Sequence, residues 1–225
     1  MLNRMSAKKG FFYKNGLSLT FVTLFLIALI GQAYFGWMEN NGHLQESGYP
    51  SIALLEYLKT GHFISATFEN FQSEFLQMSL YVILTVSLRQ IGSAESKSLD
   101  KMEEVDREPD PHKNDAPKPV KKGGWRLFLY KRSLSIAFVL LFVLSWSGHL
   151  YGSFKEYNLD QKINNKAQID LMDYLIKPKF WFESFQNWQS EFISVAAIIV
   201  LTIFLRQKGS PESKPVDAAH METGK

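Results

Sequence analysis

The sequence of 225 residues contains no cysteine, which excludes disulfides, thiolate zinc sites, iron–sulfur clusters and cysteine nucleophiles. A strong net charge is also missing. The balance is +3 at pH 7 and the basic residues are dispersed at segment ends, so nothing indicates a nucleic-acid partner. The five histidines show no metal-ligand spacing, and no phosphate-binding loop, dinucleotide fingerprint or nucleophile elbow occurs. We therefore expect a protein that is not an enzyme and that carries no cofactor or metal.

Charged residues are absent from two long apolar runs, 17–38 and 134–151. The first run has 22 residues and would form a helix of about 33 Å, enough to cross about 30 Å of hydrocarbon. Two shorter uncharged runs, 75–88 and 192–205, each follow an aromatic-rich and mildly polar stretch, and each becomes long enough when joined to it. The pattern predicts four transmembrane helices, at about 17–38, 64–89, 134–152 and 181–206.

The first apolar run has a competing interpretation as a cleaved signal peptide, because Lys8, Lys9 and Lys14 precede it. The same Tyr-Lys-x-x-Leu-Ser pattern recurs at 130–135, where a signal peptide cannot lie, so we expect the first run to be retained. Basic residues flank the spans on the side shared by both termini and the central segment. The positive-inside rule therefore predicts a multi-pass protein of the plasma membrane with both termini in the cytoplasm.

A two-helix unit occurs twice in the chain, 117 residues apart. Aligning position i with i+117 needs no gap from Tyr13 to Lys97, and 16 of the 30 positions in 68–97 are identical to those in 185–214. Because each unit has an even number of spans, both units insert with the same orientation and the repeat is parallel. The predicted organisation is an N-terminal tail 1–12, a first unit 13–97, a linker 98–124, a second unit 125–214 and a C-terminal tail 215–225.

The segments between the spans differ in composition. In the first outer loop Ile52, Leu55 and Leu58 share one helical face, and the second loop repeats the pattern. We expect a short amphipathic helix in each outer loop, which either lies on the outer leaflet or packs over the bundle as a lid. The linker is rich in acidic residues and proline. It cannot bury enough apolar surface to offset its ordering entropy, so we expect a mostly disordered tether rather than a docking site.

The repeated sequence Gln-Ser-Glu-Phe, at 72–75 and 189–192, contains the strongest candidate for chemistry. Glu74 precedes Arg89 by 15 residues, or about 22 Å of helix. If Arg89 marks the inner interface, the acid lies inside the outer edge of the hydrocarbon, where an ionisable group is a functional hypothesis because a charge there is costly. In the first unit a polar stripe continues from the acid at helical spacing: Glu74, Gln77, Tyr81, Thr85 and Arg89. In the second unit the stripe thins, because an isoleucine interrupts it: Glu191, Ser194, Ile198, Thr202 and Arg206.

Gln32 and His149 occupy equivalent sites near the outer ends of the first and third spans, where they are candidate partners of the acids. A contact between His149 and Glu191 would hold a proton or cation, since histidine titrates near neutral pH. The alternative, which we favour, is that these groups form hydrogen bonds between helices and fix their packing. The expected function is accordingly a structural or accessory role in a membrane assembly. A small-ion or proton transporter using Glu74 and Glu191 is the alternative.

The repeated tail Arg-Gln-x-Gly-Ser-x-Glu-Ser-Lys follows each exit helix, at 89–97 and 206–214. Its arginine and glycine are typical of a helix end, whereas the repeated Glu-Ser-Lys indicates a contact on the cytoplasmic face. With FWFESFQNWQSEF and the acidic linker, these blocks resemble a family of small bacterial membrane proteins catalogued only as a domain of unknown function, over about 13–216. The resemblance implies four spans in a bacterial inner membrane and supplies no activity, cofactor or catalytic residue. The expected partners are the lipid bilayer, a second copy of the chain or another membrane protein.

Overall fold

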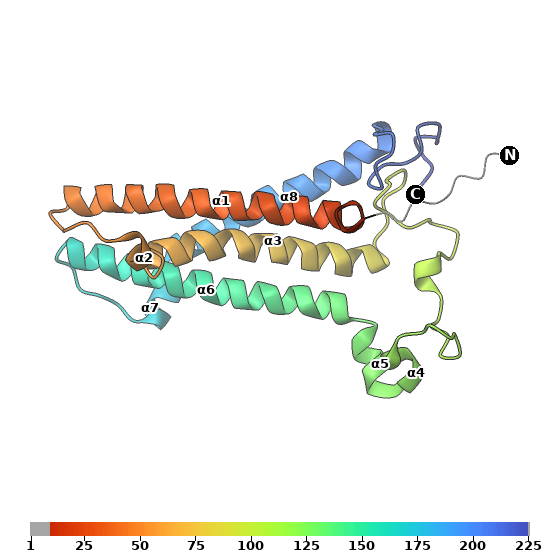
Figure 1. Cartoon of the computed structure of the whole chain (residues 1–225), viewed down its shortest axis with the longest axis horizontal. Helices are drawn as coiled ribbons and strands as arrows, with labels where there is room; N and C mark the ends of the chain where they lie inside the picture. Colours follow the sequence, from red (N-terminus) through yellow and green to blue (C-terminus); the bar gives the residue numbers. More distant parts are fainter. Residues whose placement is uncertain (1–9, 225) are drawn as a thin grey trace.

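The computed structural model describes residues 10–224, which are helical and contain no strand (Figure 1). An all-helical fold is therefore confirmed for this part of the chain. Of the predicted N-terminal tail, 1–9 lie outside the described residues, and the first helix already begins at Phe11. The elements are α1 (Phe11–Glu46), α2 (Leu54–Tyr57), α3 (Gly61–Ser87), the 3-10 turn η1 (Glu104–Asp106), α4 (Lys118–Lys122), α5 (Gly124–Tyr130), α6 (Ser133–Ile163), α7 (Leu171–Leu175) and α8 (Pro178–Phe204).

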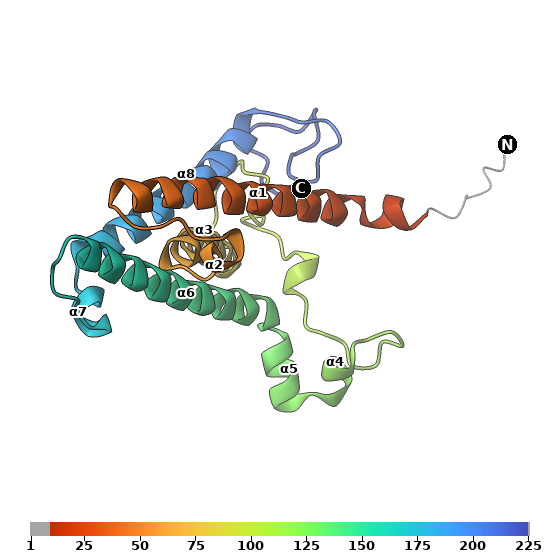
Figure 2. The same cartoon turned by 60° about the vertical axis from the view of Figure 1, so that its left-hand side comes forward.

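α3 is the central helix of the bundle. It lies between α1 and α6, and α8 crosses it obliquely (Figures 1 and 2). Its packing is most extensive against α6, smaller against α8 and smallest against α1. α2 and α7 lie at one end of the bundle, while the segment from α3 to α6 and the C-terminal tail lie at the other (Figure 1). We call these the outer end and the inner end, after the sides predicted from the sequence.

Glycines on both helices allow α3 and α6 to approach closely. A Cβ atom on Gly152 would lie 2.3 Å from the backbone nitrogen of Ser65, and one on Gly61 would lie 2.6 Å from the carbonyl oxygen of Gly152. One turn earlier on α6, a Cβ atom on Gly148 would lie 2.6 Å from the ring of Phe68. The Gly-x-x-x-Gly spacing of 148–152 is typical of closely packed membrane helices.

Three helices of the described chain, α1, α6 and α8, are long and apolar enough to cross a membrane. Their apolar side chains point outward; Phe35 on α1 is 67% exposed and Leu144 on α6 is 66% exposed. Extended apolar surface of this kind marks contact with a membrane or another protein. Three of the four predicted spans are therefore helices that are long and apolar enough to cross a membrane. α3 is not apolar enough, because it carries polar residues that face its neighbours: the buried ones are Ser65, Thr67, Gln72, Ser73 and Ser79.

The outer loops are fixed to α1 and α6 by the same hydrogen bonds, 117 residues apart. The Asn41 side chain exchanges two bonds with the Ile52 backbone, of 3.1 and 2.9 Å. The Asn158 side chain exchanges two with the Ile169 backbone, each of 3.0 Å. An asparagine can do this because its amide carries both a donor and an acceptor. These bonds set the course of the chain into α2 and α7.

The predicted outer-loop helices are present as α2 and α7, each only about one turn long. Each turns a tyrosine toward the bundle: Tyr57 is 1% exposed and Tyr174 is completely buried. Leu55, from the predicted apolar stripe, is instead 74% exposed. The buried contact is therefore made by the tyrosine and not by that stripe. This packing favours the lid over a helix that only rests on the leaflet.

The repeated tail after each exit helix folds into a local turn at the inner end. The Ser96 hydroxyl accepts a hydrogen bond of 3.0 Å from the Gln90 backbone, and Ser213 accepts one of 2.9 Å from Gln207. The turn needs a left-handed residue, and Gly92 supplies it with a φ of 80°. The second serine of the repeat therefore stabilises the turn itself.

Between this turn and α6 the chain forms only short elements. Lys97 donates a hydrogen bond to Asp106, and this bond holds the pKa of that carboxyl below its usual range. Farther along, Lys131 pairs with Glu108 at 2.8 Å. Exposed pairs of this kind contribute little to stability. That the linker is mostly disordered stays a prediction.

Candidate functional site

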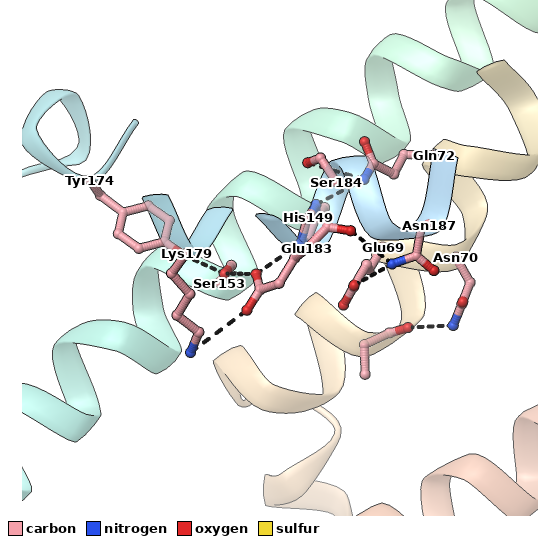
Figure 3. A network of polar contacts seen from close by, with 11 residues as sticks. Glu69, Asn70, Gln72, His149, Ser153, Tyr174, Lys179, Glu183, Ser184 and Asn187 are labelled. Carbon is pink, nitrogen blue, oxygen red and sulfur yellow. Dashed lines mark hydrogen bonds and ion pairs between the residues drawn. The ribbon is translucent and has the colours of Figure 1, made fainter. Parts of the chain in front are cut away.

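Polar side chains from four helices converge inside the outer half of the bundle (Figure 3). α3, α6 and α8 carry most of them, and α7 adds one from the outer loop. We call this group the polar centre. Its members are Glu69 and Gln72 from α3, His149 and Ser153 from α6, Tyr174 from α7, and Lys179, Glu183, Ser184 and Asn187 from α8.

His149 links α3 to α8 within the polar centre. It is completely buried, and its ring centroid lies 5.0 Å from that of Phe180. Nδ1 is 3.1 Å from the Gln72 Nε2 and accepts a hydrogen bond from it. A neutral imidazole that accepts at Nδ1 carries its proton at Nε2. That nitrogen lies 3.5 Å from the Glu183 Oε2, so the imidazole has a carboxylate as its neighbour although no hydrogen bond joins the two atoms.

The Glu183 carboxylate is held by groups from α6 and from its own helix, α8. The Ser153 hydroxyl donates to Oε2 over 2.9 Å, the Lys179 Nζ lies 3.8 Å from Oε1, and His149 lies on the Oε2 side. The Tyr174 hydroxyl contacts Ser153 in turn. Burial raises the pKa of Tyr174, so this hydroxyl keeps its proton. Because the Ser153 proton is directed at Glu183, Tyr174 donates to Ser153, and a chain of donors runs from the loop to the carboxylate.

Gln72 and Glu69 extend the polar centre along α3. Gln72 is completely buried; its Nε2 reaches both His149 on α6 and, at 3.5 Å, the Ser184 hydroxyl on α8. Asn187 donates from α8 to the Glu69 carboxylate. Two buried atoms, the Gln72 Oε1 and the His149 Nε2, make no hydrogen bond among the described residues. Apart from the Lys179–Glu183 pair within α8, the contacts between these side chains cross from one helix to another.

The first unit has a smaller and more open polar group at its outer end. Gln32 donates from Nε2 to the Thr67 hydroxyl over 3.1 Å. The Tyr57 hydroxyl lies 2.9 Å from the His62 Nδ1, and the His62 Nε2 lies 3.1 Å from Glu39. Burial, with the charge of Glu39 adding to it, raises the pKa of Tyr57 to about 12. The Glu39 side chain is 67% exposed, so solvent screens its pairing with the histidine.

The acids predicted from the sequence lie outside the polar centre. Glu74 is exposed and Glu191 is half-buried, and their carboxyl groups interact electrostatically between α3 and α8. The predicted contact between His149 and Glu191 does not form. Glu183, about two turns earlier on α8, is the carboxylate beside His149. Gln32 forms its hydrogen bond within the first unit and not with either acid.

The other predicted stripe residues are dispersed along the inner half of the bundle. The Tyr81 hydroxyl bonds to the turn after α3, and Thr202 on α8 reaches the same turn. Thr85 bonds to a carbonyl of its own helix. Gln77 lines a groove between α3 and α8. The sequence stripe is therefore not one continuous polar surface.

The guanidinium groups of Arg89 and Arg206 close the inner ends of α3 and α8. Nη1 of each donates to the last carbonyls of its helix, over 3.0–3.4 Å for Arg89 and 2.9–3.2 Å for Arg206. A cation at this position also meets the negative end of the helix dipole. That both arginines anchor the inner membrane interface stays a prediction.

Several members of the polar centre lie where the two units differ, so matching identical residues does not find them. Glu183 stands at the position that Ala66 has in the first unit. One signal was available: Lys179, Glu183 and Asn187 recur every fourth residue and so share one face of a helix. The chemistry that the centre offers is hydrogen bonding and an imidazole beside a carboxylate. Within the described residues, no group of three or more histidine or acidic side chains could hold a metal ion.

Comparison with known families gives one match. A family model described as a domain of unknown function (DUF6766) matches residues 8–225, nearly the whole chain. The resemblance to a family of unknown function is thereby confirmed. No curated protein and no solved structure was found to match the chain.

Proposed function

The chain belongs to the DUF6766 family, and on that premise we propose that it is a four-span protein with a structural or accessory role in a bacterial inner-membrane assembly. The proposal includes two tandem units and cytoplasmic termini. The family description carries no activity, so the support comes from the geometry. Three features support the proposal: the apolar helices, the polar helix at the centre of the bundle and the buried polar centre.

Crossing of the membrane by α3 is supported by the length and the surroundings of this helix. Its 27 residues rise about 40 Å, which matches a bilayer of about 40–45 Å with its headgroups. Polar residues are tolerated at membrane depth when they face a bundle interior. Gln72 and Ser73 do so, with exposures of 0% and 2%. A central helix can therefore cross without being apolar overall.

Two tandem units are supported by contacts that recur 117 positions apart. Besides the asparagine bonds of the outer loops, each unit turns a tyrosine hydroxyl onto the same point of its long helix. A Cβ atom on Gly36 would lie 2.3 Å from the Tyr57 hydroxyl, and Tyr174 bonds to Ser153, which stands 117 positions after Gly36. The shared pattern favours a duplicated unit whose loop contacts are kept and whose interior side chains differ.

The structural role rests on one observation above all: the buried Gln72 amide joins α3 to both α6 and α8. Hydrogen bonds between membrane helices contribute about 0.6 kcal/mol on average. Leaving a buried partner without its bond costs about 1–3 kcal/mol. Such a centre therefore fixes which faces of the three helices meet. Its polar atoms are largely occupied by one another, as a packing role requires.

The test compares Gln72→Leu with Gln189→Leu, since Gln189 is the equivalent residue of the second unit and is exposed. We expect Gln72→Leu to lower the free energy of unfolding by about 1–2 kcal/mol, because His149 and Ser184 lose a partner. Gln189→Leu should change it by less than about 0.5 kcal/mol. Equal effects would contradict the structural role. Reversible unfolding in mixed micelles, followed by tryptophan fluorescence, measures both.

Proton or small-ion passage is the second candidate, and the buried His149 beside Glu183 favours it. The pair is shared between α6 and α8, and a proton moving between them would stay out of bulk water. Glu74 and Glu191, which interact electrostatically nearby, would supply further carboxylates in this function.

Flux measurements separate the two functions. Liposomes containing the protein or the double variant Glu74→Gln, Glu191→Gln are loaded with a pH-sensitive dye, and proton entry is followed after a pH step. His149→Gln, which places in the second unit the residue that Gln32 supplies in the first, is measured in parallel. Transport requires a flux above empty liposomes that these variants reduce. No flux above empty liposomes, or flux unchanged while stability falls, supports the structural role.

A further inference from the structure

An apolar groove opens between α3 and α8 toward the inner end. It has a volume of about 500 Å³, within the range of about 300–1,000 Å³ for small-molecule sites. The small residue Ala196 is part of its lining. The two helices line it with aliphatic and aromatic side chains: Leu80, Leu84 and Leu88 from α3, and Phe192, Val195 and Ile199 from α8. The turn after α3, which includes Glu95, lines the groove as well.

Arg89, an exposed residue directly after α3, lines the inner end of this groove. Nη1 of Arg89 caps α3, whereas its Nε and Nη2 form no hydrogen bond or ion pair with the described residues. The equivalent arginine of the second unit is fully engaged. Arg206 donates from Nε to the Pro215 carbonyl over 3.2 Å and from Nη2 to the Ala218 carbonyl over 3.0 Å. The two equivalent arginines therefore differ: Arg89 has its Nε and Nη2 left to bind a ligand, whereas Arg206 uses both of these nitrogens within the chain.

We propose that the groove binds one acyl chain of an inner-leaflet phospholipid, with the phosphate on the open edge of Arg89. The helical walls of the groove are mainly apolar, as an acyl chain requires, and Arg89 lies at the inner end, where headgroups are expected. A guanidinium presents two donors in the fork geometry that a phosphate oxygen pair accepts. This inference goes beyond the structural role, and rests on the membrane placement proposed with it.

The test is a titration of the delipidated full chain with phosphatidylglycerol, read by native mass spectrometry. Diacylglycerol with the same acyl chains serves as the ligand without phosphate. We expect phosphatidylglycerol to bind about tenfold more tightly than diacylglycerol, because charge-assisted hydrogen bonds are strong. Arg89→Gln should remove this preference. Arg206→Gln, the matched control, should keep it.

A second pair of variants tests the groove without changing a charge. Ala196→Phe fills the groove and should weaken binding of both lipids. Ile198→Phe, on another face of α8 and outside the groove lining, should leave both unchanged. Unfolding midpoints of all variants are measured in the same micelles, so that loss of binding is compared only among folded samples.

Two results would overturn the lipid site: equal phosphatidylglycerol binding by the Arg89 and Arg206 variants, or unchanged binding by Ala196→Phe. Failure of the membrane placement is visible separately. Alkaline carbonate washing of the source membranes would then release the wild-type chain into the soluble fraction. A chain that resists this wash but fails the titration contradicts the lipid site alone.

Discussion

The outer ends of the two units have the same loop contacts but different polar side chains between their helices. Where the first unit has Gln32 and Ala66, the second has His149 and Glu183. The acid of the first unit's pair, Glu39, is 67% exposed, whereas the second unit pairs a completely buried histidine with Glu183, which is 21% exposed. The outer loops of both units are held by the same asparagine bonds, and only the second unit places a histidine and an acid among several helices. The difference locates the polar centre in the second unit, against the central helix α3.

The inner ends differ in the opposite sense. The second unit's Lys214 is 2% exposed, and its Nζ donates to the carbonyls of Ala219, His220 and Glu222. These bonds fold the C-terminal tail beside Arg206. The equivalent lysine of the first unit reaches Asp106 in the linker and leaves Arg89 beside the groove. At this end the arginine of the second unit is thus enclosed by its own tail. The turn of the first unit is buried against α8 and the C-terminal tail, and its arginine stays exposed.

The largest effect is expected where helix packing differs between the units. Gly152→Ala would place a Cβ atom 2.3 Å from the Ser65 backbone and should lower the free energy of unfolding by about 3 kcal/mol, because neither backbone can yield. Gly31→Ala, on the loosely packed α1 with nothing within 4 Å, should be neutral or stabilising by up to about 1 kcal/mol. Denaturant unfolding in micelles gives both values. A tolerated Gly152→Ala would show that α3 and α6 are farther apart.

A smaller effect is expected from the two acids. Glu183→Ala, which restores the residue of the first unit, should lower the free energy of unfolding by about 2 kcal/mol, because the Ser153 hydroxyl loses a charged acceptor and His149 loses the neighbouring carboxylate. Glu39→Ala removes a mostly exposed carboxylate and should change it by less than about 1 kcal/mol. The same unfolding assay measures the pair. If the two losses were equal, the contrast between a buried and an open acid would fail.

The smallest effect is expected from the two lid tyrosines. Tyr174→Phe should lower the free energy of unfolding by about 1 kcal/mol, since the Ser153 hydroxyl loses its donor. Tyr57→Phe removes a bond to the partly exposed His62 and should have about half that effect, because water replaces the lost partner. Hydrogen exchange of the outer loops, read by mass spectrometry, locates each change. A larger effect at Tyr57 would contradict the conclusion that the polar group of the second unit is the more enclosed of the two.

Much of the fold could be predicted from the sequence, because the uncharged apolar runs and the pattern that recurs after 117 residues can be recognised without knowledge of tertiary contacts. The runs at 17–38 and 134–151 lie within α1 and α6, and the outer-loop helices occur where the stripe predicted them. α3 is harder to recognise as a span, because its polar residues suit a position among other helices that composition does not reveal. Gly148 and Gly152 were readable as a close-packing signal, but their partner helix was not.

The candidate site was harder to predict than the fold. Identical residues such as Glu74 and Glu191 indicate what the two units share, which is mainly the arrangement of helices and loops. Glu183 joins His149 only because α8 crosses α3 and α6 obliquely, and that crossing depends on tertiary packing. The prediction of His149 as a member of a polar site was useful, while the choice of its acid was wrong.

The central claim, that the polar centre fixes helix packing, is tested most directly by a double-mutant cycle between Gln72 and His149. Gln72→Leu, His149→Leu and the double variant are unfolded under one set of micelle conditions. The structural role predicts a coupling free energy of about 0.6–1.7 kcal/mol, from the average to the maximum measured for hydrogen bonds between membrane helices. A coupling of zero would contradict it, because two side chains that fix one interface cannot be lost independently.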